Sequence, residues 1–145
     1  METLERIIQQ AGNDPLTTGF SGLTITSATD IRVLSDLTGS AGPASPDKGD
    51  PDGDTNDSGE DVRIRFDVGD HAIELVVGGT AQPIANNISD FSLQFFDRDG
   101  VATNVGDDVR RIRISLTGAS PVPDPQTGHT FSLHLSSDVQ LAVRQ

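Results

Sequence analysis

The acidic stretch DPDGDTNDSGED, residues 50–61, has the composition and spacing of a calcium-binding loop. Ca²⁺ takes about six to eight oxygen ligands, and a calcium loop supplies them from alternate positions and from its last residue. Counted from the first aspartate, these positions hold Asp50, Asp52, Asp54, Asn56, Ser58 and Asp61. The spacing therefore predicts a Ca²⁺ site in this stretch.

Several details also allow a second interpretation of the acidic stretch. Thr55 stands where an EF-hand loop has glycine, and Asp61 is shorter than the glutamate that usually ends such a loop. No helical pattern flanks the stretch, so it is not an EF-hand. Residues 47–61 hold seven acidic residues against Lys48 alone, a charge of −6, and such a loop can also stay extended and solvated through charge repulsion. Both interpretations remain open from these residues.

The composition limits the classes of partner. A chain of 145 residues suffices for one domain. With 22 Asp and Glu against 10 Lys and Arg, the net charge is −12, which argues against nucleic acid or an anionic lipid surface, because phosphate binding needs clustered cations. The absence of cysteine excludes disulfides, thiolate zinc sites and a cysteine nucleophile.

No residue pattern indicates an enzyme. The three histidines, His71, His129 and His134, adjoin no nucleophile, zinc-binding or phosphate-binding motif. His134 stands between two leucines of an alternating segment, so it is expected to point away from the sheet core. Asp97 and Asp99 precede a glycine and indicate a turn rather than a metal site. We therefore expect a protein without catalytic activity.

The positioning elements begin with a helix at residues 2–11. Its apolar spacing is carried by Leu4, Ile7, Ile8 and Ala11. Gly12 is expected to end it in the left-handed conformation. Arg6 follows Thr3 by three positions, so the start has no capping box. This pattern fits either an ordinary frayed helix or the last turns of a longer one.

After the helix, apolar residues alternate with polar ones, as in half-buried strands. Strands are expected at residues 30–37, 62–68, 71–77, 91–96, 111–116, 131–137 and 139–143. Gly69 is expected to supply the positive φ of a hairpin turn, and Asp138 to form a turn or bend. The proline-rich stretch 121–130 is expected to be a loop.

The order of one helix followed by strands predicts an α+β fold. An antiparallel sheet of five to seven strands would turn its apolar face toward the helix. Two long connections, residues 38–61 and 117–130, interrupt the strands, and long connections in compact domains are often functional.

The succession of segments resembles the soluble part of a type IV pilin-like protein of the PilW or J-type minor pseudopilin group. The segments are LERIIQQAG, ITSATDIRVLSDLTG, GEDVRIRFD, HAIELVV, PIANNISDFSLQFFDRDG, VRRIRISLTG and FSLHLSSDVQLAVR. The resemblance spans nearly the whole chain and rests on the order of loose motifs. The sequence departs from the group at Phe66 and Phe96, where Tyr is frequent, and it lacks a prepilin cleavage site and the usual Asn near the end.

The resemblance implies that residues 1–145 form one pilin-like head domain. Residues 1–12 would be the remnant of a truncated N-terminal helix packed on an antiparallel sheet, and 38–61 an acidic insertion. The full helix would anchor the subunit in the inner membrane with the head in the periplasm. The subunit would then join a periplasmic or extracellular filament of the cell envelope.

The function implied by the resemblance is assembly. A minor pilin or pseudopilin helps to initiate or cap a type IV pilus or a type II secretion pseudopilus by contacting other minor subunits and the major pilin. Some members of the superfamily use Ca²⁺ to order a head loop. For this chain, the resemblance implies Ca²⁺ at Asp50, Asp52, Asp54, Asn56 and Asp61, with Glu60 as a substitute donor.

The alternative function is an extracellular β-rich binding or adhesin module with a calcium-ordered loop. Its weakness is the lack of Trp and Tyr, because sugar recognition relies on aromatic stacking.

Overall fold

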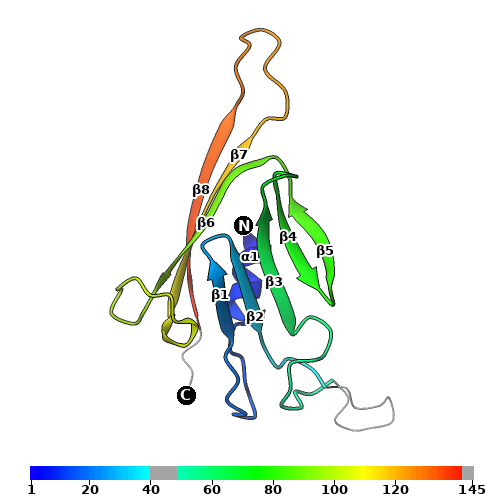
Figure 1. The fold of residues 1–145 in the computed structure, drawn as a ribbon, viewed down its shortest axis with the longest axis vertical. Coiled ribbons are helices and arrows are strands. Elements are labelled where there is room, and N and C mark those ends of the chain that lie inside the picture. Colours follow the sequence, from blue (N-terminus) through cyan, green and yellow to red (C-terminus); the bar gives the residue numbers. More distant parts are fainter. Residues whose placement is uncertain (40–48, 142–145) are drawn as a thin grey trace.

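The computed structural model describes residues 1–39 and 49–141, which form one α-helix, one short 3-10 helix and eight strands. In chain order these are α1 (Glu2–Gln9), β1 (Leu23–Ser27), β2 (Asp30–Leu34), β3 (Asp61–Asp67), β4 (Ala72–Val77), β5 (Thr80–Ala85), β6 (Ile88–Phe96), η1 (Gly106–Asp108), β7 (Arg111–Ala119) and β8 (Ser132–Gln140). The strands make two antiparallel sheets, with the orders β1-β2-β3-β4-β5 and β6-β7-β8 (Figure 1).

The α+β class predicted from the order of elements is confirmed, and α1 lies where the apolar stripe predicts a helix. Gly12 follows the helix with a φ of 73°. Its N–H donates to the carbonyl of Leu34 at 2.9 Å, so the same residue ends α1 and ties it to the first sheet. At Met1 no side-chain hydrogen bond caps the helix, as the missing capping box predicts.

The prediction of a single sheet is wrong, because the chain leaves the first sheet between β5 and β6. Asn87 has a φ of 58°, a left-handed conformation that asparagine tolerates and that redirects the chain. Backbone hydrogen bonds join the sheets at two places: the N–H of Leu93 in β6 donates to the carbonyl of Ala28 at 2.7 Å, and the N–H of Ile88 donates to the carbonyl of His71 at 2.9 Å. The apolar side chains of both sheets therefore pack into one shared core.

The alternation pattern does not predict β1 or β5. All but the last side chain of β5 are exposed, so its sequence, TAQPIA, has no alternation of apolar and polar residues that would predict a strand. Gly78 and Gly79 precede it with φ values of 57° and 80°, the backbone of a tight hairpin turn. The glycine pair is therefore the sequence feature that could have predicted a hairpin turn and hence β5.

Two predictions about turns are also wrong. In the β3–β4 turn the positive φ belongs to His71, at 49°, and not to Gly69. The carboxylate of Asp67 shapes this turn instead, because its Oδ1 accepts the N–H groups of Gly69 at 2.8 Å and Asp70 at 3.1 Å.

The second wrong prediction is a break at Asp138, because β8 pairs with β7 in one register through this residue. Its Oδ1 accepts from Arg113 Nε at 2.8 Å and its Oδ2 from Arg111 Nη1 at 3.0 Å. Such cross-strand ion pairs accommodate a charged residue within a strand. The end of the expected strand at 139–143, from Ala142 onward, lies outside the described residues.

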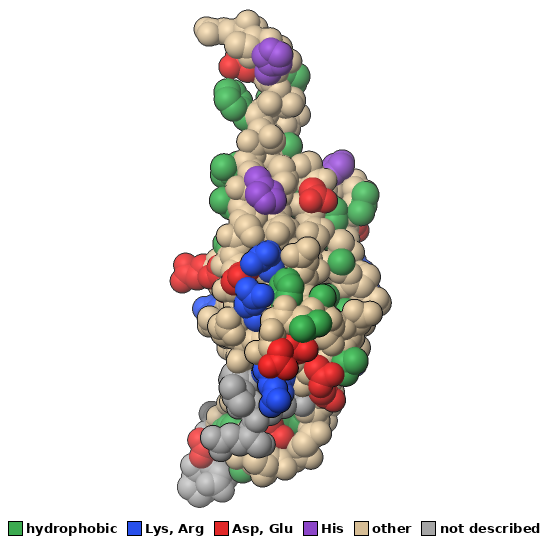
Figure 2. Space-filling view, turned by 90° about the vertical axis from the view of Figure 1, so that its left-hand side faces the viewer, with side chains coloured by type: hydrophobic (Ala, Val, Ile, Leu, Met, Phe, Trp, Pro, Cys, Tyr) green, Lys and Arg blue, Asp and Glu red, His purple; other side chains and the backbone are tan. Residues whose placement is uncertain are grey.

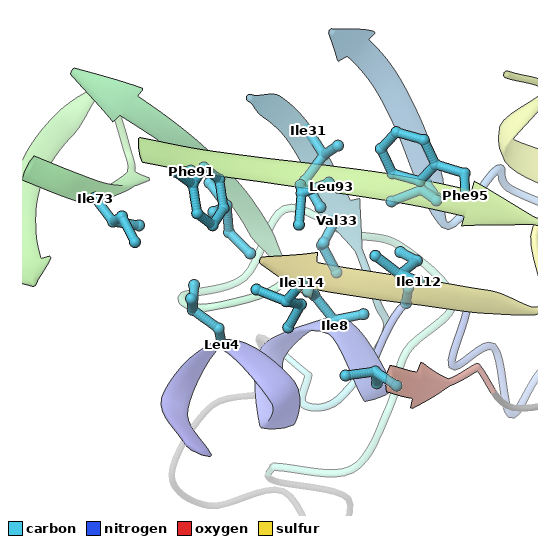
Figure 3. Packing of buried hydrophobic residues seen from close by; sticks show 14 of the residues in the cluster. Leu4, Ile8, Ile31, Val33, Ile73, Phe91, Leu93, Phe95, Ile112 and Ile114 are labelled. Carbon is cyan, nitrogen blue, oxygen red and sulfur yellow. The ribbon is translucent and has the colours of Figure 1, made fainter. Parts of the chain in front are cut away.

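The core lies between α1 and the inner faces of the two sheets. Leu4 and Ile8 are buried and point toward the side chains of β6 and β7 (Figure 3). Burial of each contributes about 1.5–3 kcal/mol. The helix also contacts the last strand, where the hydroxyl of Ser137 donates to Glu5 Oε1 at 2.5 Å. The first and last elements of the chain therefore complete one core.

Candidate functional site

The connection between β2 and β3 is folded by a buried carboxylate at its start. Asp36 follows β2 and is fully buried. Its Oδ1 accepts the N–H of Asp52 at 3.2 Å, and its Oδ2 accepts the N–H of Gly53 at 2.9 Å. A carboxylate buried in this way needs such donors, because desolvated charge without hydrogen bonds is costly.

A second buried carboxylate, Glu60, acts from the other end of the connection. Its Oε1 accepts the N–H groups of Leu37 and Thr38, both at 2.7 Å. Its Oε2 accepts the N–H of Asp57 at 3.1 Å. Asp36 and Glu60 thus fix the acidic segment 49–60 against the end of β2.

Three acidic side chains of this segment converge. Asp52, Asp54 and Asp57 each offer a carboxylate oxygen, and the three oxygens lie within 4.8 Å of one another. Two short turns bring them together. The N–H of Asp54 donates to Asp52 Oδ1 at 3.2 Å, and the N–H of Asn56 donates to Asp54 Oδ1 at 2.8 Å. This group can hold a metal ion.

Asp57 is the most unusual member of the group. Its Oδ2 is the buried side-chain atom, within the described part of the chain, that has no hydrogen-bond partner. Desolvation raises the pKa of Asp57, and the carboxylates of Asp52, Glu60, Asp54 and Asp36 raise the pKa further. Every neighbouring charge in that set is negative, so the arrangement would gain from a bound cation.

Of the residues predicted to bind Ca²⁺, the structure brings Asp52 and Asp54 together. The carboxylates of Asp50 and Asp61 are not in the converging group, and Asn56 donates its backbone N–H to Asp54 Oδ1. Asp61 lies in β3, where its two carboxylate oxygens pair with Nε and Nη2 of Arg32.

The predicted substitute donor, Glu60, binds backbone N–H groups. The sequence reasoning missed Asp57, which falls between the alternate positions of a calcium loop counted from residue 50. It also missed Asp36, which has no sequence signal beyond standing between polar and apolar residues at the end of a strand.

A second acidic group contains Asp67, Asp70 and Glu74, whose oxygens also lie within 4.8 Å of one another. Here the carboxylates have other partners. Asp67 accepts two N–H groups of its own turn, and Glu74 Oε2 accepts from Arg65 Nε at 2.7 Å. The guanidinium already supplies positive charge, so the loop group is the better candidate for a metal.

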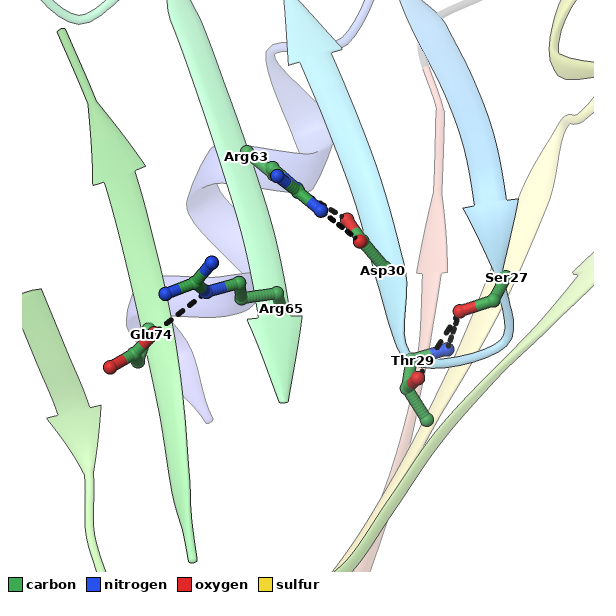
Figure 4. A network of polar contacts seen from close by, with 6 residues as sticks. All are labelled: Ser27, Thr29, Asp30, Arg63, Arg65 and Glu74. Carbon is green, nitrogen blue, oxygen red and sulfur yellow. Dashed lines mark hydrogen bonds and ion pairs between the residues drawn. The ribbon is translucent and has the colours of Figure 1, made fainter. Parts of the chain in front are cut away.

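The arginines of the first sheet are committed to cross-strand ion pairs. Arg63 pairs with Asp30 on β2, and Arg65 pairs with Glu74 on β4 (Figure 4). These pairs join three neighbouring strands on the outer side of the sheet. Although the protein has a net charge of −12, positive and negative side chains alternate on this exposed side of the sheet.

Within residues 1–39 and 49–141, the structure assembles no catalytic group around the histidines. His71, His129 and His134 are all exposed, and they lie in a turn, a long loop and a strand. A cavity of about 660 Å³ lies between the β1–β2 turn and β6. Its one charged lining residue is Arg113, which pairs with Asp138. Nothing in this lining resembles a nucleophile with its base.

Comparisons with known proteins add no family assignment. No family model and no curated protein matches this sequence. Among the described residues, no helix has both the length and the apolar character needed to span a membrane. The case for a function therefore rests on the residues and their arrangement.

Proposed function

We propose that this chain is the head of a non-catalytic minor pilin or minor pseudopilin. It would help to initiate or cap a type IV pilus or a type II secretion pseudopilus by binding other minor subunits. The observation that carries the proposal is the place of α1, whose Leu4 and Ile8 are buried against both sheets. A head packed on an N-terminal helix is the arrangement that the resemblance implies.

The proposal requires further helical residues before Met1, anchored in the inner membrane. The start of α1 suits such a continuation, because no side chain caps it. Its first backbone N–H groups are then available to a preceding helical turn. The described residues place no catalytic group around the histidines, which supports a role in assembly over catalysis.

The test uses the native protein purified from the source membrane. Mass spectrometry should find an N-methylated phenylalanine at the mature terminus, followed by about 20 apolar residues, and other minor pilins or pseudopilins should co-purify. A terminus left by a conventional signal peptidase would overturn the proposal. Binding to a glycan array would instead favour an adhesin module.

We extend the proposal to Ca²⁺ at Asp52, Asp54 and Asp57. The specific support is the unpartnered Oδ2 of Asp57 beside two other carboxylates. Ca²⁺ fits better than Mg²⁺, because it accepts an irregular cage of carboxylate, carbonyl and water oxygens. Bound there, the ion would offset the repulsion among these carboxylates and stabilise the segment that Asp36 and Glu60 hold.

Isothermal titration calorimetry tests the Ca²⁺ proposal. The wild-type chain should bind one ion, and the double variant Asp52→Ala/Asp54→Ala should bind none. A matched control is Asp67→Ala/Asp70→Ala, which removes two acids from the second acidic group and should leave binding intact. Heat that is absent at millimolar Ca²⁺, or unchanged in the first variant, would contradict the proposal.

A further inference from the structure

The two sheets have four outer edges, and three of them are protected against pairing with another strand. The β5 edge contains Pro83 and an irregular register. The β1 edge is irregular after Ile25 and is covered by η1, where Gly106 lies against the carbonyl of Leu23. The β6 edge bonds to Ala28 and bridges to Ala102. Proline, irregular register and cover are the usual devices against edge-to-edge association.

The outer edge of β8 has none of these devices. This strand runs for nine residues, Ser132–Gln140, in one unbroken register and without proline. Within the described residues no strand pairs with its outer side. Its single acidic residue, Asp138, is already paired with Arg111 and Arg113, so it adds little repulsion to the edge.

The backbone groups on this edge are identified by the bonds at its two ends. Ser120 donates to the carbonyl of Phe131, and Leu141 donates to the carbonyl of Arg110. Hydrogen-bonded pairs recur every second residue in an antiparallel ladder. The odd-numbered residues of β8 therefore bond to β7, and the even-numbered ones direct their N–H and carbonyl groups outward.

The same strand exposes apolar side chains as it leaves the body of the protein. Leu133 and Leu135 are 63% and 41% exposed, although they stand on the face that carries the buried Val139, and Phe131, just before the strand, is 71% exposed. Beyond the pairing of Ile88 with Gly118, residues 119–132 form an arm that rises above the rest of the molecule (Figure 1); its base is the pair Ala119 and Ser132, and the rest is a loop. The end of β8 beside this arm has β7 as its single neighbour among the described strands, so it would gain from an additional strand.

Charge favours association at this edge over other parts of the surface. From Thr117 to Ser137 the chain holds one acidic residue, Asp124, and neither Lys nor Arg. The arm accordingly shows few charged side chains at the top of Figure 2. Two copies that each carry a net charge of −12 repel one another least where weakly charged segments lie at the junction.

We propose that β8 pairs in antiparallel orientation with β8 of a second copy of this chain, about a twofold axis. The two three-stranded sheets would then form one continuous sheet, and β8 of each copy would gain a second neighbouring strand. With Ser136 facing Ser136 of the other copy, His134 faces Asp138 across the junction, which adds opposite polarity at two symmetric positions. This interaction does not depend on the proposed filament role, because it needs no other subunit.

Sedimentation velocity of the purified chain tests this pairing. The wild type should shift from monomer to dimer as its concentration rises to several hundred micromolar. Ser136→Pro removes an outward N–H and spares the bonds to β7, and Leu133→Glu places a charge on the exposed apolar face. Each should weaken dimerisation by about tenfold or more, with an unchanged circular dichroism spectrum.

The matched control is Ile84→Glu, which adds the same charge to an exposed aliphatic residue of β5 and should leave the dimer intact. The second readout is a single thiol at Ser136→Cys, since the chain has no cysteine. A short bismaleimide should cross-link it to itself, whereas Gln82→Cys on β5 should stay monomeric. A wild type that is monomeric at every concentration, or a dimer that survives Ser136→Pro and Leu133→Glu, would overturn the pairing.

Discussion

Asp36 and Glu60, both fully buried, hold the two ends of the β2–β3 connection together. Each carboxylate accepts backbone N–H groups from the opposite half of the connection. Asp36 at the end of β2 binds Asp52 and Gly53. Glu60 at the start of β3 binds Leu37 and Thr38. The described parts of this connection, residues 35–39 and 49–60, are therefore organised by hydrogen bonds to two buried charges.

The first prediction concerns Glu60→Gln. The amide keeps the size of the side chain but replaces one acceptor oxygen with an N–H₂ group that faces backbone donors. We expect a loss of about 1–3 kcal/mol in the free energy of unfolding, because buried N–H groups lose their partner. Urea denaturation followed by circular dichroism measures this loss.

A suitable control for this variant is Glu2→Gln on the exposed face of α1, which should change stability little. Equal stability of Glu60→Gln and the wild type would show that the bonds to Leu37 and Thr38 contribute nothing net.

The second prediction concerns the close approach of η1 to β1. A Cβ added to Gly106 would lie 1.9 Å from the carbonyl oxygen of Leu23, so the backbone must move. We expect Gly106→Ala to lower the free energy of unfolding by about 1–3 kcal/mol. In contrast, Gly118→Ala in β7 places its Cβ no closer than 3.9 Å to a neighbour. Thermal denaturation should show a clearly lower Tm for the first variant alone.

The third prediction is a pH dependence at the pair formed by Arg32 and Asp61. The hydrogen bond from Arg32 lowers the pKa of Asp61 below its usual 3.8. A lowered carboxyl pKa stabilises the folded state above pH 3.8, and this contribution is lost as the pH falls through the lowered pKa. The pair is about half exposed, so its contribution is about 0.2–1 kcal/mol.

Unfolding of Asp61→Asn across the acidic range checks the sign. The variant should be less stable than the wild type at neutral pH, and the gap should close below pH 3.8. High salt should narrow the gap as well. A gap that widens with acid would rule out this account of the pair.

The fourth prediction concerns Asp57, whose negative charge is expected to destabilise the fold, unlike that of an ordinary surface carboxylate. Its raised pKa means that its carboxylate destabilises the folded state at neutral pH, a penalty relieved as the pH falls through that raised value. We therefore expect Asp57→Asn to raise the Tm in the presence of EDTA and to diminish the rise in Tm that Ca²⁺ gives the wild type. Asp70→Asn is the matched control and should do neither.

Differential scanning calorimetry with EDTA and with Ca²⁺ provides both comparisons. A variant that is less stable than the wild type in EDTA would show that Asp57 has a favourable partner, contrary to its buried and unpartnered Oδ2.

The spacing of apolar residues and the order of the segments were enough to predict the helix, the α+β class and six of the eight strands in the described part of the chain. They failed where a strand has no apolar face, as in β5, and where a short connection moves the chain to another sheet, as at Asn87. Such turns depend on single backbone conformations, which leave no periodic signal.

The candidate metal site was predicted only in part for a related reason. Spacing along an extended loop brings alternate residues to one side, and it selected Asp52 and Asp54, whose carboxylates converge in the structure. The loop is instead folded by Asp36 and Glu60, and this folding turns Asp57 inward and leaves Asp61 in β3 with Arg32. Partners far apart in sequence therefore determined the outcome.

The contact between Glu5 of α1 and Ser137 of β8 has a consequence during synthesis. The helix leaves the ribosome well before the strand that completes its packing, so Leu4 and Ile8 stay exposed until β6, β7 and β8 have been synthesised. Early chain segments would meanwhile expose apolar surface, a situation in which chaperones commonly bind nascent proteins. A chain truncated before β8 would therefore be unable to complete its hydrophobic core.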